Sequence, residues 1–91
     1  MTTATIGTRR SPVEIIFDIL SVCESGANKT SVMYRSNLSH DQLVKYLGYL
    51  TDQDLLVLDA RRHRVTEKGT AMLDEVSQVT DLLRELRGDD A

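Results

Sequence analysis

Two helix starts lie so close together in this sequence that the helices must meet across a tight turn. Thr30 or Ser31 can serve as the N-cap of a short predicted helix that runs through about Ser36. Ser39 and Gln42 have the three-residue spacing of a capping box and predict a second helix through about residue 52. Only the letters NL separate the two helices, and so short a connection predicts a helix-turn-helix.

The second helix of this pair has one apolar side and one polar side. The expected buried stripe is Leu43, Tyr46, Leu47 and Leu50. Gly48 lies on the opposite side, where glycine costs about 1 kcal/mol relative to alanine. Either another backbone or a ligand approaches closely at this point, or the helix simply tolerates the defect.

Another helix is predicted ahead of the pair, and the letters SPVE mark its start. Ser11 takes the N-cap position, Pro12 the first helical position and Glu14 the capping-box position opposite Ser11. Gly26 suits the left-handed position that follows a helix, so this helix spans about residues 12–24. Its expected buried stripe is Val13, Ile16, Phe17 and Leu20.

Beyond the helix-turn-helix the pattern changes to short apolar runs. LLVLD and HRVT, at residues 55–59 and 63–66, predict a two-stranded hairpin with the letters ARR between the strands. A hairpin this small is stable only when it packs on other elements. Thr66 then caps a last helix over residues 67–88.

These elements predict a mainly α-helical fold with a small β-hairpin. Their order is that of a winged helix-turn-helix with a long C-terminal dimerisation helix. With 91 residues the chain is long enough for one folded domain and too short for two. The expected organisation is a disordered arm over 1–10, the winged domain over 11–66, the dimerisation helix over 67–88 and a tail over 89–91.

Apolar residues on the last helix recur at the spacing of a coiled-coil seam. They follow one another at intervals of four, three, four and three residues, over about two heptads. The seam predicts a dimer contact, although part of the helix must pack on its own domain. Its residues are Met72, Val76, Val79, Leu83 and Leu86.

Charge is distributed unevenly along the chain. The formal net charge of -3 argues weakly against a nucleic-acid binder, because a basic domain is the usual footprint of one. Residues 26–66 nevertheless carry six Lys and Arg against four Asp, whereas residues 67–91 carry three against seven acidic residues. The run LDARRHRVT holds three arginines within four residues, and neither capping nor packing explains them.

Several runs resemble archaeal winged-helix regulators of the ten-a chromatin-protein type. They are SPVEIIFDIL, then GANKTSVMYRSNLSHDQLVKYLGYLTDQDLL, and then VTEKG, and together the likeness covers about residues 11–80. The resemblance implies a DNA-binding protein that dimerises through a C-terminal antiparallel coiled coil. It also implies that the helix from Ser39 enters the major groove and that the hairpin wing contacts the backbone or the minor groove. Wings of this family often turn on glycine, whereas this one has the letters DARRH.

The residues expected to contact double-stranded DNA come from both helices of the helix-turn-helix and from the wing. Ser39 and Gln42 have a second explanation in the capping box, and His40 has one as an exposed first-turn residue. The arginines have no such explanation, because guanidinium groups bind phosphate and the edges of guanine. The full set is Lys29, Thr30, Arg35, Ser39, His40, Gln42, Lys45, Arg61, Arg62 and Arg64.

The rival interpretation is a winged helix used for protein interaction without DNA binding. In that case the apolar seam binds a different protein and the wing arginines meet an acidic partner. The acidic net charge of the whole chain favours this alternative.

Other classes of function find little support in the sequence. It contains no glycine-rich phosphate loop and no Cys/His set with metal-ligand spacing, so we expect neither an enzyme nor a cofactor or metal site. Cys23 falls on an apolar helix and is expected to be a buried small hydrophobe. No apolar run suggests a secretion signal or a membrane span, so a cytoplasmic, nucleoid-associated protein is expected.

Overall fold

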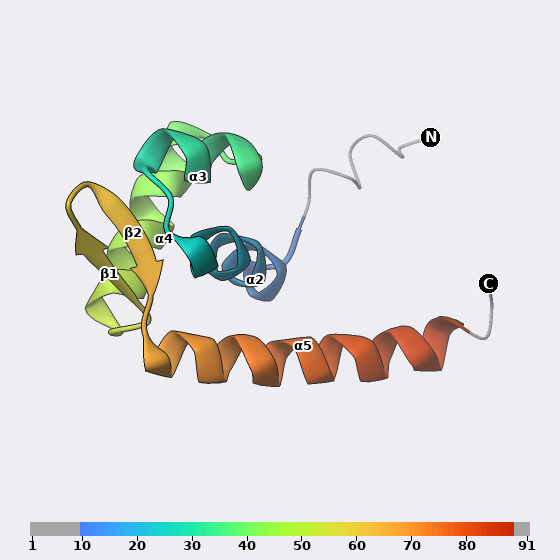
Figure 1. Cartoon of the computed structure of the whole chain (residues 1–91). Helices are drawn as coiled ribbons and strands as arrows, with labels where there is room; N and C mark the ends of the chain where they lie inside the picture. Colours follow the sequence, from blue (N-terminus) through green and yellow to red (C-terminus); the bar gives the residue numbers. More distant parts are fainter. Residues whose placement is uncertain (1–9, 89–91) are drawn as a thin grey trace.

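The computed structural model describes residues 10–88 of the chain. Of the expected arm at residues 1–10 only Arg10 falls within this range, and the expected tail at 89–91 lies outside it. The fold class is confirmed: four α-helices and one antiparallel hairpin form a winged helix-turn-helix that runs into a long last helix (Figure 1). The elements are α2 (Pro12–Val22), the short 3-10 helix η1 (Cys23–Ser25), α3 (Lys29–Arg35), α4 (His40–Asp52), β1 (Leu56–Asp59), β2 (Arg62–Val65) and α5 (Glu67–Gly88).

Helix starts follow the local sequence signals. Both predicted capping boxes are present: Ser11 exchanges hydrogen bonds with Glu14, and Ser39 does the same with Gln42. The start of α3 differs from the prediction, because Asn28 is the N-cap and its side-chain oxygen accepts a hydrogen bond from the Ser31 amide at 2.8 Å. Asparagine is as good an N-cap as serine, so the helix begins at the first suitable residue after η1.

The core forms where α2, α3, α4, the hairpin and the start of α5 meet. Leu43, Leu47 and Leu50 are buried from α4 as predicted, and Tyr46 is half-buried. The predicted stripe of α2 is partly wrong. Ile15 and Ile19 are buried with Leu20, whereas Val13 is 56% exposed and Ile16 and Phe17 lie at the edge of the core.

The wing is a tight hairpin with strands in register from Leu56 opposite Val65 to Asp59 opposite Arg62. Its turn has only two residues, Ala60 and Arg61, and both have positive φ, at 49° and 70°. This geometry is that of a type I′ turn, which matches the twist of paired strands. Arg62 therefore belongs to β2 and not to the turn in which the sequence pattern placed it.

β2 fastens the wing to the rest of the domain. Ala27 and His63 exchange two backbone hydrogen bonds, at 2.7 and 3.0 Å, and form a short bridge beside the hairpin. β1 pairs with the other edge of β2, so β2 lies between the segment after η1 and β1. The hairpin is thus packed on the helices, as its small size requires.

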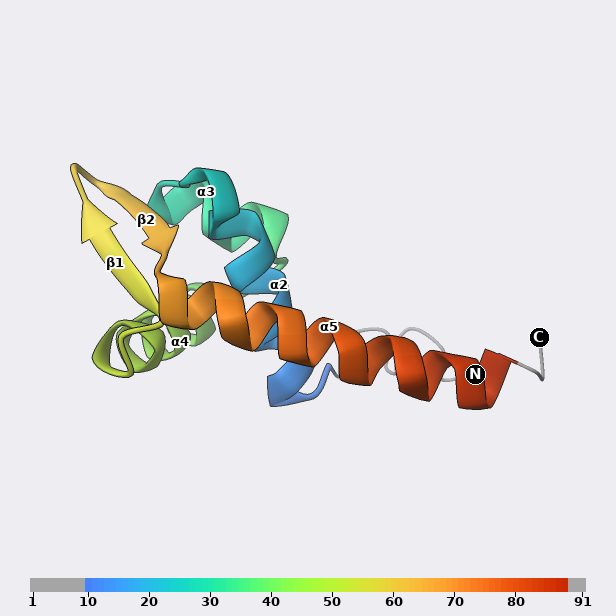
Figure 2. The same ribbon diagram turned by 60° about the horizontal axis from the view of Figure 1, so that its bottom comes forward.

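Helix α5 has two parts with different surroundings. Near its start Leu73 is buried and Met72 packs against the core, and α2 lies alongside this helix (Figure 2). Farther along the helix the ribbon extends beyond the other elements, and its apolar side chains are exposed. Within residues 10–88, no helix combines the length and apolar character needed to span a membrane.

Candidate nucleic-acid interface

The outer side of α4 is the first part of the candidate interface. His40 and Lys45 are exposed, as are Ser39 and Gln42 at the start of the helix. Ser39 and Gln42 are nevertheless engaged with each other, since each side chain bonds the backbone amide of the other at 3.2 Å. Their structural role is therefore established, whereas Lys45 is the cation that α4 presents to solvent opposite its buried leucines.

The tip of the wing is the second part. Arg61 lies in the turn and Arg62 begins β2, and both side chains are exposed. Because a two-residue turn is stiff, these guanidinium groups are carried at the end of a short, well-defined projection. Among the described residues, neither arginine takes part in an ion pair within 4 Å.

Arg64 differs from its two neighbours. Its guanidinium Nε lies 3.8 Å from the Asp59 carboxylate, and the side chain runs over Gly26. A Cβ atom at Gly26 would lie 3.3 Å from the Arg64 guanidinium, and the φ of this glycine is +85°. Arg64 therefore lies along the side of the wing between Gly26 and Asp59, whereas Arg61 and Arg62 are at its tip.

The histidine within the arginine run has a core position. His63 is only 9% exposed, because β2 turns this side chain toward the domain while Arg62 and Arg64 face solvent. Burial is the main cause that lowers the pKa of His63, and the charge of Lys29 lowers the pKa further, while a hydrogen bond with the Ala27 backbone opposes these effects. His63 is therefore neutral at pH 7 and does not add to the positive charge of the wing.

The start of α3 lies near the wing. Lys29 and Thr30 are exposed in its first turn, and Lys29 is close enough to His63 to influence its titration. Arg35 is exposed at the other end of α3, and its charge acts on the Cys23 thiol. Cys23 is fully buried as expected, and burial raises the pKa of its thiol to about 11 although Arg35 opposes the shift. This thiol is therefore unreactive at neutral pH.

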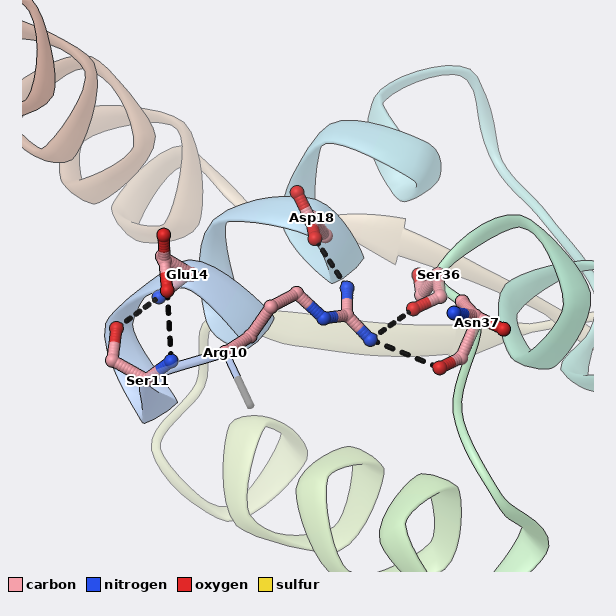
Figure 3. Close-up of polar contacts among 6 residues, drawn as sticks. All are labelled: Arg10, Ser11, Glu14, Asp18, Ser36 and Asn37. Carbon is pink, nitrogen blue, oxygen red and sulfur yellow. Dashed lines mark hydrogen bonds and ion pairs between the residues drawn. The ribbon is translucent and has the colours of Figure 1, made fainter. Parts of the chain in front are cut away.

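Arg10 is a residue that the sequence analysis missed, because it was assigned to the disordered arm. Its guanidinium pairs with the Asp18 carboxylate on α2 and donates to the carbonyls of Ser36 and Asn37, at 2.6 and 2.9 Å (Figure 3). These carbonyls belong to the turn between α3 and α4, where Asn37 has a φ of 55°. Arg10 thus ties the turn of the helix-turn-helix to α2 through partners far away in the sequence.

The predicted seam of α5 has a first part that packs on the domain and a second part that is exposed. Met72 is half-buried and packs against the core of its own domain, so part of its surface is already covered, while its place in a dimer contact stays a prediction. Val76, Val79 and Leu83 line a groove of about 700 Å³ between α5 and the start of α2, with Val13 on the other side. Val79 and Leu83 are about half exposed, at 54% and 51%, and Leu86 is 67% exposed. Leu82, which the heptad spacing omitted, is also exposed.

Nothing in the described part of the chain has the composition of a metal site. Among residues 10–88, no three His, Cys, Asp or Glu side chains come together as ligands would.

Comparison with known proteins agrees with this architecture. The winged helix-turn-helix family matches residues 9–84. The uncharacterized proteins MJ0290 and MJ0287 of Methanocaldococcus jannaschii are 32% and 26% identical to this chain over 76 residues, which is 82% of its length. The chain spans 36% of the length of MJ0290 and 78% of that of MJ0287.

A solved structure shows the same fold. The crystal structure of Sso10a-2, a DNA-binding protein from Sulfolobus solfataricus, superposes with a TM-score of 0.78 at 27% identity. The likeness covers 89% of this chain and 90% of that protein. The resemblance to small archaeal winged-helix proteins is thereby confirmed, and the chain belongs to the winged helix-turn-helix family.

Proposed function

We propose that the protein binds double-stranded DNA, with α4 in the major groove and the wing on the backbone or the minor groove. The observation that carries the proposal is the pair of exposed arginines, Arg61 and Arg62, at the tip of a stiff hairpin on a winged helix-turn-helix. The neighbour of the same fold, Sso10a-2, is described as a DNA-binding protein. A recognition helix in the groove and a wing beside it is the arrangement that this fold presents to a duplex.

The distribution of charge supports the proposal that α3, α4 and the wing face the DNA. Phosphate contacts by Arg and Lys release condensed counterions, and this release supplies most of the non-specific affinity for DNA. The cations of α3, α4 and the wing supply such contacts, while the acidic surplus of the chain is carried by residues 67–91. The net charge of -3 therefore does not describe the surface that would meet the duplex.

Individual roles follow from position. Lys29, Thr30 and Arg35 on α3, together with Lys45 on α4, suit phosphate or groove contacts because they are exposed. Ser39 and Gln42 would act mainly by fixing the start of α4, and His40 adds a donor in its first turn. Arg61 and Arg62 would reach DNA from the tip of the wing, and Arg64 would support them from its side.

We also propose that the protein is a homodimer joined by the second half of α5. An apolar strip runs along this half of the helix, next to a groove that reaches Val13. Val79, Leu83 and Leu86 are exposed in the strip, and Val76 is half-buried. A two-fold contact between such strips would present two α4 helices and two wings to one duplex. We infer a non-enzymatic regulator of transcription or an architectural protein of the nucleoid.

Titration of a labelled random-sequence duplex at several salt concentrations tests DNA binding. We expect binding at low salt and a linear fall of log affinity with log salt concentration. Absence of binding at low salt would rule out the proposal. It would favour the alternative in which the wing and the apolar strip bind proteins.

A further inference from the structure

Gly48 is the one glycine within residues 10–86 for which the chain itself provides no reason. Gly26 has a φ of +85°, which side chains other than glycine rarely adopt. A Cβ atom on Gly69 would lie 2.2 Å from the carbonyl oxygen of Leu55. A Cβ atom on Gly48 would meet nothing within 4 Å. Packing therefore explains the first two glycines and leaves the third unexplained.

The missing side chain has a cost. Gly48 lies well inside α4, which spans His40–Asp52, and glycine at such a position destabilises a helix by about 1 kcal/mol relative to alanine. Alanine would fit without any displacement of neighbouring atoms. The stability of the chain thus favours alanine at a position where glycine stands.

The position of Gly48 on the helix is also informative. Asp41, Lys45, Gly48 and Asp52 follow at intervals of four, three and four residues, so they form one line along the helix. All four are exposed, and the line lies opposite the buried Leu43, Leu47 and Leu50. Gly48 is therefore on the part of α4 that projects farthest from the core.

The two carboxylates on this line limit how α4 can lie against a duplex. Asp41 and Asp52 would be repelled by a row of phosphates, which disfavours contact of this line with the backbone. Over the floor of the major groove the same carboxylates face base edges, where the amino group of cytosine donates to an acidic side chain. This orientation requires the helix to enter the groove centrally, with the line of four residues pointing inward.

We propose that Gly48 is the point of closest approach between α4 and the base edges. The inference rests on the proposed DNA binding and adds the depth and rotation of the helix in the groove. Without a side chain at this position, the backbone of α4 comes closer to the bases by the thickness of a methyl group. Contacts on either side, from Val44 and Tyr49, which are both about half exposed, then also reach the groove floor.

Gly48→Ala tests the inference because the proposal predicts opposite effects on stability and binding. The equilibrium constant for unfolding should fall about fivefold, since the helix propensity improves and no atom is in the way. Affinity for duplex DNA should fall by about fivefold or more, the loss that one disturbed base contact causes. Gly48→Leu, which also favours a helix, should lower affinity further because its side chain is longer.

Thr70→Ala on α5 is the matched control. It also replaces an exposed residue by a better helix former, but it lies outside α4 and the wing. It should raise stability without changing the affinity for DNA, which separates a steric effect from a general effect of stabilisation.

The outcomes distinguish this inference from the proposed function. If the parent chain binds no duplex, DNA binding itself fails, and the inference fails with it. If the parent binds and Gly48→Ala and Gly48→Leu bind equally well, α4 does not approach DNA at Gly48 although the protein is a DNA binder. Weaker binding of both variants together with unchanged binding of Thr70→Ala supports the inference.

Discussion

The wing and the second half of α5 both project from the same core, in opposite directions, yet their chemistry differs (Figures 1 and 2). The wing ends in Arg61 and Arg62, whereas α5 carries an apolar strip among acidic residues. An exposed guanidinium group is well hydrated and binds phosphate favourably. An exposed leucine lowers its free energy only when an apolar partner removes it from water. The comparison teaches that the two ends of one small domain present different chemistry, one cationic and one apolar.

The largest expected effect comes from placing charge in the apolar strip. Val79→Asp and Leu83→Asp should each raise the dimer dissociation constant at least about a hundredfold, because an unpaired carboxylate in an apolar contact costs several kcal/mol. Sedimentation in the analytical ultracentrifuge measures the change. Gln78→Asp introduces the same residue at an exposed position beside the strip and should leave the dimer intact. Dimers that persist in the first two variants would show that the strip is not the contact.

The next effect concerns the core from which both projections extend. Arg10→Ala should lower the free energy of unfolding by about 2 kcal/mol, since it removes a partly buried charged group with three hydrogen-bonded partners. Denaturant titration measures this loss. Arg84→Ala, which removes an exposed ion pair with Asp81 on α5, should change stability by no more than about 0.5 kcal/mol. Equal losses in the two variants would contradict the role given to Arg10.

Arg62 and Arg64 should contribute unequally to DNA binding by the wing. Arg62→Ala should weaken binding to all duplexes and reduce the slope of log affinity against log salt by about one unit, as the loss of one phosphate contact does. Arg64→Ala should reduce the slope less, because the Arg64 side chain is directed toward Asp59 and Gly26. Binding titrations at four or more salt concentrations measure both slopes. Identical slopes for the two variants would show that the wing arginines act as equals.

The smallest effect is the expected change in the free energy of unfolding when the pH is lowered. Burial and the charge of Lys29 lower the pKa of His63, so the unfolded chain binds a proton here more readily than the folded one. Stability that is present above the ordinary histidine pKa of about 6.5 should therefore decrease as the pH falls below it. Unfolding measured between pH 8 and pH 5 tests this sign. His63→Gln should remove this contribution, whereas His40→Gln, at an exposed position, should preserve it.

Local signals in the sequence predicted the elements well. The capping boxes of Ser11 and Ser39, and Thr66 as the cap of α5, are all present in the structure. Each depends on hydrogen bonds between residues three positions apart, so neighbouring letters contain the necessary information. The same reasoning failed at α3, because Asn28 and the predicted Thr30 or Ser31 are all suitable N-caps and the helix uses Asn28.

Contacts across the chain could not be predicted in this way. Apolar residues occupy positions 13, 15, 16, 17, 19 and 20, so several stripes of α2 were compatible with the sequence. The positions of α3 and α5 selected the stripe of Ile15 and Ile19. Arg10 was missed for the same reason, since its partners are 8, 26 and 27 residues away. The contacts that the wing, α4 and the distal strip of α5 make with DNA or a second subunit stay predictions.

Local sequence signals are sufficient for the starts of α2, α4 and α5, for the hairpin after the helix-turn-helix, and for the concentration of cations before the last helix, but not for the start of α3. Which of these side chains are exposed to solvent depends on the tertiary structure. It turned His63 into the core, placed Arg64 between Gly26 and Asp59, packed Met72 partly against the core and left Gly48 in open space. The physical reason is that helix starts depend on nearby hydrogen-bonding groups, whereas exposure depends on elements that approach from distant parts of the chain.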